Sequence, residues 1–242
     1  MIRSVLITGG TKGIGKAVCA GLLNEGWVVI ATYAADTQTA SSVFDDFNQR
    51  FPTRFSVLQA DCSEPGSIDT IHAYIQSHQL RLDAIVFNAG LTDRSTFGNL
   101  TLESWRNVFS ANVDFPVFLL QALNESINTQ ASIVFTGSQM GIQPHAVSLS
   151  YGVSKAAVHA LVKNLVKFYA DRHIRVNAVA PGFVDTDWHI SKPAVIRQRI
   201  TDKIALGRFG TPEELAEVYL FLINNSYMNG EVVVCDGSYS YK

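Results

Sequence analysis

The feature that most constrains the fold of this chain is the alternation of short β-forming runs with helical segments. Residues 4–8 form a short apolar run, a glycine-rich turn and a helical segment follow it, and residues 27–33 are again strongly β-forming. The alternation continues with short connections, without internal repeats or linkers. Such a pattern builds a parallel sheet covered by helices on both faces. The sequence therefore predicts one α/β domain over residues 1–242, doubly wound around a seven-stranded parallel sheet.

The boundaries of these elements follow from hydrophobic periodicity and from glycine and proline positions. Strands are predicted over residues 4–8, 27–33, 55–60, 84–87, 133–136, 174–179 and 231–235. The last helix should begin at a capping box formed by Thr211 and Glu214. One helix is expected to run unbroken over residues 101–123, with a core-facing side made of Leu102, Trp105, Val108 and Phe109.

Composition excludes several classes of protein. Hydrophobic residues make up 47% of the chain and charged residues 17%, which is enough for a sizeable core. The net charge of −2 without a basic run argues against nucleic-acid binding. No apolar stretch approaches the ~20 residues of a membrane span, and the first seven residues reach glycines before a signal-peptide core could form. Cys19, Cys62 and Cys235 form no C-x-x-C pair, so we expect reduced thiols, no metal site and a cytoplasmic protein.

The glycine-rich turn after the first strand is a candidate site for a dinucleotide. Gly9, Gly13 and Gly15 would allow a tight turn, close approach of the backbone to a pyrophosphate, and packing of the helix on the strand. The alternative is a connecting turn that binds nothing, but a strand before it and a helix after it favour the cofactor. The spacing differs from G-x-G-x-x-G, because three residues separate Gly9 from Gly13.

Polar and glycine residues also follow four other predicted strands. Ligands of doubly wound sheets bind beyond the carboxyl ends of the strands, so these residues should share one rim with the glycine-rich turn. Each alone would be an ordinary turn residue, but together they predict a site. They are Asp61, Asn88-Ala89-Gly90, Ser138 and Pro181-Gly182.

Tyr151 and Lys155 stand four residues apart in a predicted helix, so their side chains share one face. A phenol has a pKa near ~10, which a neighbouring ammonium lowers by favouring the phenolate. The pair could then work as a general acid or base. Alone it could be coincidence, so its meaning depends on a third catalytic group and a cofactor.

Together these motifs resemble those of the short-chain dehydrogenase/reductase family over essentially the whole chain. The resemblance implies a Rossmann-type domain that transfers hydride between a nicotinamide and a carbonyl or alcohol. The matching motifs, in the family's order, are Thr8-Gly9-x-x-x-Gly13-Ile14-Gly15, Asn88-Ala89-Gly90, Asn112, Ser138, Tyr151-x-x-x-Lys155 and Pro181-Gly182.

The resemblance also implies roles for the matching residues. Tyr151 would protonate the developing alkoxide, and Ser138 would hydrogen-bond the same oxygen. Lys155 would lower the Tyr151 pKa and hold the nicotinamide ribose, and Asn112 would hold a water that links Lys155 to solvent. The residues expected to contact the cofactor are Gly9, Thr11, Lys12, Gly13, Ile14, Gly15, Asp61 (on the adenine amino group), Cys62, Asn88, Ala89, Gly90, Tyr151, Lys155, Pro181, Gly182, Val184 and Thr186.

Two features favour NADP(H) over NAD(H). NAD-specific members of this fold place an acidic residue at the end of the second strand, and that position here is Tyr33. Lys12 offers a cation where a 2′-phosphate could lie. Against this, Asp36 could fold back onto the ribose, so NAD(H) stays open. His145 and His189 are candidates only for lining the pocket.

The segments after Pro181-Gly182 and around Arg208-Phe209-Gly210 most closely resemble reductases of 3-oxoacyl thioesters on acyl carrier protein. Residues 187–206 would form a lid whose apolar side chains suit an acyl chain, namely Trp188, Ile190, Val195, Ile196 and Ile200. One departure is that residues 128–130 carry no cation to dock an acidic carrier, although Arg172 offers one.

A small alcohol, ketone, sugar or polyol is therefore the alternative substrate. A non-enzymatic dinucleotide sensor is a further alternative, but Asn112, Ser138, Tyr151 and Lys155 argue against it, because a sensor needs no proton donor. The resemblance also implies a homotetramer or dimer built on the helices that begin near Thr101 and Tyr151, the second of which is apolar on most sides.

Overall fold

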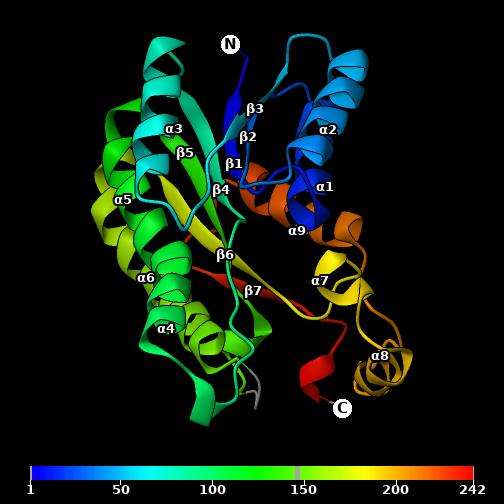
Figure 1. Cartoon of the computed structure of the whole chain (residues 1–242). Helices are drawn as coiled ribbons and strands as arrows, with labels where there is room; N and C mark the ends of the chain where they lie inside the picture. Colours follow the sequence, from blue (N-terminus) through cyan, green and yellow to red (C-terminus); the bar gives the residue numbers. More distant parts are fainter. Residues whose placement is uncertain (1, 145–147, 242) are drawn as a thin grey trace.

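The computed structural model describes residues 2–144 and 148–241 and contains a seven-stranded, fully parallel sheet (Figure 1). The strand order is β3-β2-β1-β4-β5-β6-β7. From β1 the chain adds β2 and β3 toward one edge, and then crosses back to add β4 to β7 on the other side of β1. The position between β1 and β4 is therefore the switch point of a doubly wound sheet. The predicted fold class is confirmed. The strands are β1 (Ser4–Thr8), β2 (Val28–Tyr33), β3 (Phe55–Gln59), β4 (Leu82–Phe87), β5 (Ile127–Thr136), β6 (Arg175–Pro181) and β7 (Val232–Cys235).

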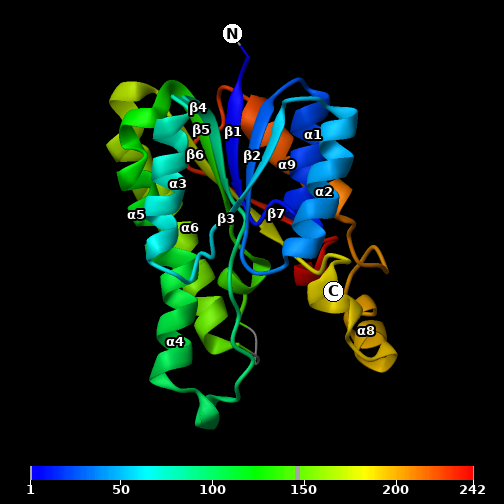
Figure 2. The ribbon, with the colours of Figure 1, turned by 45° about the horizontal axis from the view of Figure 1, so that its top comes forward.

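Helices cover both faces of the sheet, as Figures 1 and 2 show. One face carries α1 (Gly13–Asn24), α2 (Thr37–Arg50) and α9 (Pro212–Asn224). The other carries α3 (Gly66–Ser77), α4 (Leu102–Phe109), α5 (Phe115–Ala122) and α6 (Leu149–Tyr169). Two short helices, α7 (Asp187–Ile190) and α8 (Ala194–Thr201), lie between β6 and α9.

The core lies in two layers, one on each face of the sheet. Ile7 and Val86 point to the layer under α1, α2 and α9, where Leu22 and Tyr219 are fully buried. The alternate strand residues, such as Leu6 and Ile85, pack under α3, α5 and α6. Strands buried on both faces explain why their sequences read as nearly continuous apolar runs.

The predicted unbroken helix over residues 101–123 is wrong. A π-helical turn, Ser110–Asp114, separates α4 from α5. The predicted core side of this helix is right in part, because Val108 is buried and Trp105 and Phe109 are half-buried, whereas Leu102 is 64% exposed. Amphipathic spacing marks an apolar stripe but does not say what covers it.

The capping box of α9 is confirmed. The Thr211 hydroxyl accepts from the Glu214 N–H at 3.2 Å, and the Thr211 N–H donates to the Glu214 carboxylate at 2.8 Å. Among the described residues, no helix has the length and apolar character needed to cross a bilayer.

Candidate active site

A cavity of about 600 Å³ lies beyond the carboxyl ends of the strands. Its walls come from the turn after β1, the ends of β2 to β5, the start of α6 and the segment after β6. Ser138 and nearly all residues expected to contact the cofactor line it. Two predicted site residues, Gly15 and Asn112, lie behind the wall and support it.

The glycine-rich turn has the close packing that its sequence requires. A Cβ on Gly15 would lie 2.2 Å from the Gly9 carbonyl oxygen, so no side chain fits there. Gly9 adopts a left-handed φ of 65°, which glycine adopts without strain. The Asn88 amide donates to the carbonyls of Thr8 and Gly9 at 3.2 and 2.9 Å, which ties this turn to the end of β4.

The first turn of α1 fits the diphosphate of a nicotinamide dinucleotide. No side chain caps this helix, so its first N–H groups have no side-chain acceptor. Gly13 and Ile14 of this turn line the cavity. Unpaired N–H groups and the positive end of a 12-residue helix are a natural site for an anion.

The Tyr151 phenol, the Ser138 hydroxyl and the Lys155 ammonium meet at one end of the cavity. The Ser138 hydroxyl hydrogen-bonds the phenol. The Lys155 ammonium lies 5.5 Å from the centre of the Tyr151 ring and donates to the Thr136 carbonyl at 2.6 Å. The arrangement brings a proton donor, a second hydroxyl and a cation together in one part of the cavity.

The pKa of Tyr151 moves in the opposite direction to the sequence prediction. Desolvation raises it to about 12, against the opposing effect of the Ser138 hydrogen bond. Lys155 does not lower it, because its ammonium hydrogen-bonds the Thr136 carbonyl instead. Burial also lowers the pKa of Lys155 to about 8. Tyr151 is therefore a protonated acid at neutral pH.

Asn112 joins two walls of the cavity from within the π-helical turn. Its side-chain oxygen accepts from the Leu91 N–H at 2.8 Å, and its amide donates to the Leu91 carbonyl and the Ser154 hydroxyl, both at 2.9 Å. The polar atoms of this buried side chain are thus bonded within the protein, and a role of Asn112 in holding a water beside Lys155 stays a prediction. Asn112 fixes the loop after β4 against α6.

His159 is a site residue that the sequence prediction missed. It lies four residues after Lys155 on α6, is buried, and its Nε2 accepts from the Ser138 N–H at 3.3 Å. Glycines make room for the ring, since a Cβ would lie 2.2 Å from Nε2 at Gly137 and 2.9 Å from Cε1 at Gly141. The i, i+4, i+8 spacing from Tyr151 was the available signal.

Lys12 and Asp36, which gave opposing indications about the cofactor, form an ion pair in the structure. Both line the cavity. The Lys12 hydrogen bond is the main cause that lowers the pKa of Asp36 to about 2, so the carboxylate stays charged. Asp36 also caps α2 by accepting from the Thr39 N–H at 3.0 Å.

The predicted lid supplies fewer cavity residues than expected. Trp188 lines the cavity with its ring 5.8 Å from that of Tyr151, and His189 lines it too. Ile190 and Val195 are 64% and 59% exposed. His145 lies outside the described residues. A cavity residue that the sequence did not predict is Phe183, whose ring packs at tilted or edge-on angles against those of His189, Phe209 and Tyr239.

Arg172, the cation expected to steer an acidic carrier, has a structural role instead. Its guanidinium donates to the Asn124 carbonyl at 3.1 Å and to the Ile127 carbonyl. These bonds tie the end of α6 to the start of β5. A charge reversal at Arg172 would therefore disturb the fold and could not isolate a docking effect.

Comparison with known proteins gives matches along the whole chain. A family model described as Enoyl-(Acyl carrier protein) reductase matches residues 9–240. The 3-oxoacyl-(acyl-carrier-protein) reductase FabG of Aquifex aeolicus is 32% identical over 236 residues, which are 96% of this chain and 95% of that protein. The 3alpha-hydroxysteroid dehydrogenase of Mediterraneibacter gnavus is 28% identical over 241 residues, covering 98% and 96% of the two chains.

A solved structure gives the same result. The short-chain dehydrogenase of Burkholderia cenocepacia, in complex with NADP, is 26% identical with a TM-score of 0.92, and the match covers 98% of both chains. The sequence match and the structural match thus both extend over nearly every helix and strand described above. The chain belongs to the short-chain dehydrogenase/reductase family and is an oxidoreductase acting on CH–OH or C=O groups.

Proposed function

We propose that this protein is an NADPH-dependent reductase of 3-oxoacyl thioesters, with the whole chain acting as one domain in the cytoplasm. The observation that carries the proposal is the meeting of Tyr151, Ser138 and Lys155 at one end of a cavity that fits a dinucleotide. The free thiols of Cys19, Cys62 and Cys235 are in keeping with a reducing compartment.

A nicotinamide held in this cavity would supply hydride for the carbonyl carbon. Tyr151 donates its phenolic proton to the carbonyl oxygen as negative charge develops there, which completes the alcohol. Ser138 hydrogen-bonds the same oxygen and orients it. The pKa of about 12 keeps Tyr151 protonated until that charge appears, which suits the direction of reduction. Lys155, at the same end of the cavity, would hold the hydroxyls of the nicotinamide ribose.

Lys12 supports NADPH as the cofactor. Its ammonium lies at the cavity wall beside the end of β2, where it could exchange its pairing with Asp36 for a 2′-phosphate. The NADP complex of the Burkholderia cenocepacia relative supports the same choice. With NADH, the Asp36 carboxylate would accept from the ribose hydroxyl instead, so a titration with both reduced cofactors decides between them.

The thioester assignment draws on the Aquifex aeolicus relative, which is a 3-oxoacyl-(acyl-carrier-protein) reductase. We propose acyl carrier protein as the partner that presents the substrate. The Mediterraneibacter gnavus relative acts on a steroid alcohol, so a free alcohol or ketone is the second candidate. The aromatic group around Phe183 and Tyr239 is the observation that favours it.

A substrate panel tests the proposal. Acetoacetyl thioesters on acyl carrier protein and on coenzyme A, free ketones, steroids and sugars are offered with NADPH or NADH, and nicotinamide absorbance is followed. We expect the fastest turnover with the carrier thioester and NADPH. Tyr151→Phe keeps the ring but removes the donor, so turnover should fall at least ~10²-fold with unchanged cofactor binding.

Faster turnover of a free ketone, steroid or sugar would identify a different substrate. Tight NADPH binding without turnover of any carbonyl would identify a dinucleotide sensor. Binding of NADH at least ~10-fold tighter than that of NADPH would reverse the cofactor assignment.

A further inference from the structure

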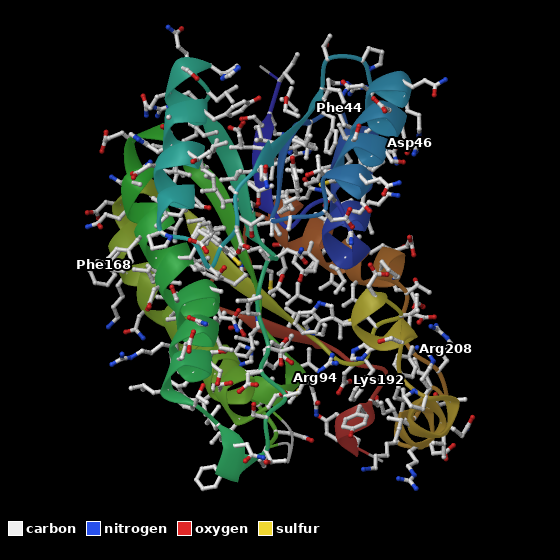
Figure 3. The ribbon with its side chains drawn as sticks, viewed as in Figure 1. Phe44, Asp46, Arg94, Phe168, Lys192 and Arg208 are labelled. Atoms are coloured by element: carbon white, nitrogen blue, oxygen red, sulfur yellow. The ribbon has the colours of Figure 1, made fainter. Side chains whose placement is uncertain are left out.

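Two cations of the cavity wall are not used by the mechanism above. Arg94 belongs to the segment after β4, and Lys192 lies between α7 and α8. Both line the cavity. Figure 3 labels the two side chains, Arg94 on the segment after β4 and Lys192 near α7 and α8. Burial is the main cause that lowers the pKa of Lys192, and the nearby charge of Arg94 is the second cause.

Within residues 2–144 and 148–241, neither cation forms an ion pair with a carboxylate. The nearby carboxylates have other partners. Asp185 pairs with Arg197 at 3.0 Å, and Asp36 and Asp187 pair with Lys12. Asp93, next to Arg94 in the chain, accepts from Ser95 and Ser104. Around His189 the cations outnumber the carboxylates. Burial is the main cause that lowers the pKa of His189 to about 4. The charges of Lys192, Arg94 and Arg197 lower this pKa as well, and the Asp185 carboxylate has the opposite effect.

Arg94 is also held near the reacting end of the cavity. Its guanidinium donates to the Trp188 carbonyl at 3.3 Å, and the Trp188 ring lies 5.8 Å from the Tyr151 ring. A group bound between Arg94 and Lys192 would thus sit beyond Trp188 while a carbonyl of the same molecule reaches Tyr151. Two like charges brought together without a counter-ion repel each other, and an anion from outside relieves that repulsion.

We propose that Arg94 and Lys192 form a subsite for an anionic group of the substrate, a phosphate or a carboxylate carried by the chain that bears the reacting carbonyl. This inference rests on the proposed carbonyl reduction and names the part of the substrate outside the reacting group. In a carrier-bound or coenzyme A thioester the anion would be the phosphate of the pantetheine arm. In a small keto acid it would be the carboxylate.

The kinetic test compares charged and neutral substrates of the same acyl group. The acetoacetyl thioester of phosphopantetheine is compared with that of N-acetylcysteamine, which has no phosphate, and acetoacetate is the small keto acid. The double variant Arg94→Gln, Lys192→Gln should lower kcat/KM at least ~10-fold, through KM, for whichever anionic substrate the enzyme uses. The neutral thioester should change less than ~2-fold.

Arg199→Gln is the matched control, because Arg199 is an exposed cation of α8 that does not line the cavity. It should leave all three substrates unaffected. Losses confined to the phosphopantetheine thioester identify the phosphate as the anion, and losses confined to acetoacetate identify the carboxylate. Equal losses on charged and neutral substrates, or no loss on any, would overturn the inference.

A binding measurement separates this inference from the proposed reaction, because it needs no turnover. Calorimetry compares phosphopantetheine with pantetheine, and acetoacetate with acetone, on the wild type and the double variant. In one of these pairs we expect the wild type to bind the anionic compound at least ~10-fold more tightly than its neutral counterpart. Salt should reduce this difference, and the double variant should show none. If that is seen while no thioester is reduced, the subsite stands and the proposed function fails. Equal binding of charged and neutral members would refute the subsite.

Discussion

The protonation state of individual site residues is set by what surrounds them. Tyr151 and His159 lie on the same helix face, eight residues apart, and desolvation moves both pKa values further toward the neutral form, up to about 12 for Tyr151 and down to about 4 for His159. Their neutral forms have different uses. Tyr151 keeps a proton to give, whereas His159 keeps a lone pair that accepts from the Ser138 N–H. We infer that His159 is a positioning residue for the Ser138 loop.

Loss of the His159 acceptor should disturb the loop that carries Ser138, although His159 itself does not contact the substrate. His159→Leu leaves the Ser138 N–H without its partner, so kcat should fall about 10-fold with little change in KM for NADPH. His159→Gln offers an amide oxygen at a similar place and should recover much of the loss. Steady-state kinetics of the three proteins check this. Equal activity of the Leu variant and the wild type would show that the hydrogen bond has no role.

The same residue predicts a pH effect on stability. Burial, then the charges of Lys155 and Lys163, lower the pKa of His159 to about 4 from 6.5. Between these values the unfolded chain binds a proton that the folded chain does not, so stability falls as the pH drops from 6.5 to 4. Urea denaturation of His159→Gln should show a smaller fall over that range. An unchanged pH dependence would mean that His159 is not the titrating group.

At the scale of elements, the break between α4 and α5 matters for the site. An unbroken α-helix would place residue 112 at a different angle, whereas the π-helical turn lets Asn112 bond the loop after β4 and also α6. A second support comes from α9, where the buried Tyr219 hydroxyl hydrogen-bonds the Thr136 side chain at 2.6 Å. The Thr136 carbonyl in turn holds Lys155.

Removal of the Asn112 side chain should therefore weaken the joint between the two walls. Asn112→Ala leaves the Leu91 N–H and carbonyl without these partners, which we expect to lower the free energy of unfolding by about 1–3 kcal/mol. Asn112→Asp keeps the acceptor but loses the donor, so its loss should be intermediate. Urea denaturation measures all three proteins. A variant Asn112→Ala as stable as the wild type would contradict this role.

At the scale of the whole molecule, the outer face of the α4–α6 layer is unusually apolar. Phe168 on α6 is 81% exposed and points away from the sheet in Figure 3. Phe118 on α5 is 54% exposed, and Leu102 and Val153 are also exposed. Because such side chains gain stability when covered, we propose that this face binds a second copy of the chain, in a dimer or homotetramer.

Light scattering at micromolar concentration should give a mass of at least twice the 26.5 kDa of one chain. Phe168→Asp should reduce that mass, because burial of a charge in an apolar interface is unfavourable. Phe44→Asp is the control, since Phe44 is 38% exposed on α2, on the other side of the sheet. A wild-type protein of 26.5 kDa would refute the assembly.

The sequence by itself determined the features that depend on neighbours along the chain. Alternating β and helical periodicity predicted the parallel sheet, and Thr211 and Glu214 predicted the start of α9, because a capping box closes within one turn. The spacing of Gly9, Gly13 and Gly15 predicted the turn that the structure places at the cavity. Strand ends could be collected at one rim because parallel strands all finish on the same edge of a sheet.

The tertiary structure alone decided the features that depend on residues far apart in the chain. The pKa of Tyr151 follows from desolvation and from where the Lys155 ammonium finds a carbonyl, and no local pattern specifies either. The same is true of His159 beneath Ser138, of Arg172 held by Asn124 and of Arg94 facing Lys192. Such contacts span tens of residues, and their energies depend on burial and distance, which exist only once the chain has folded.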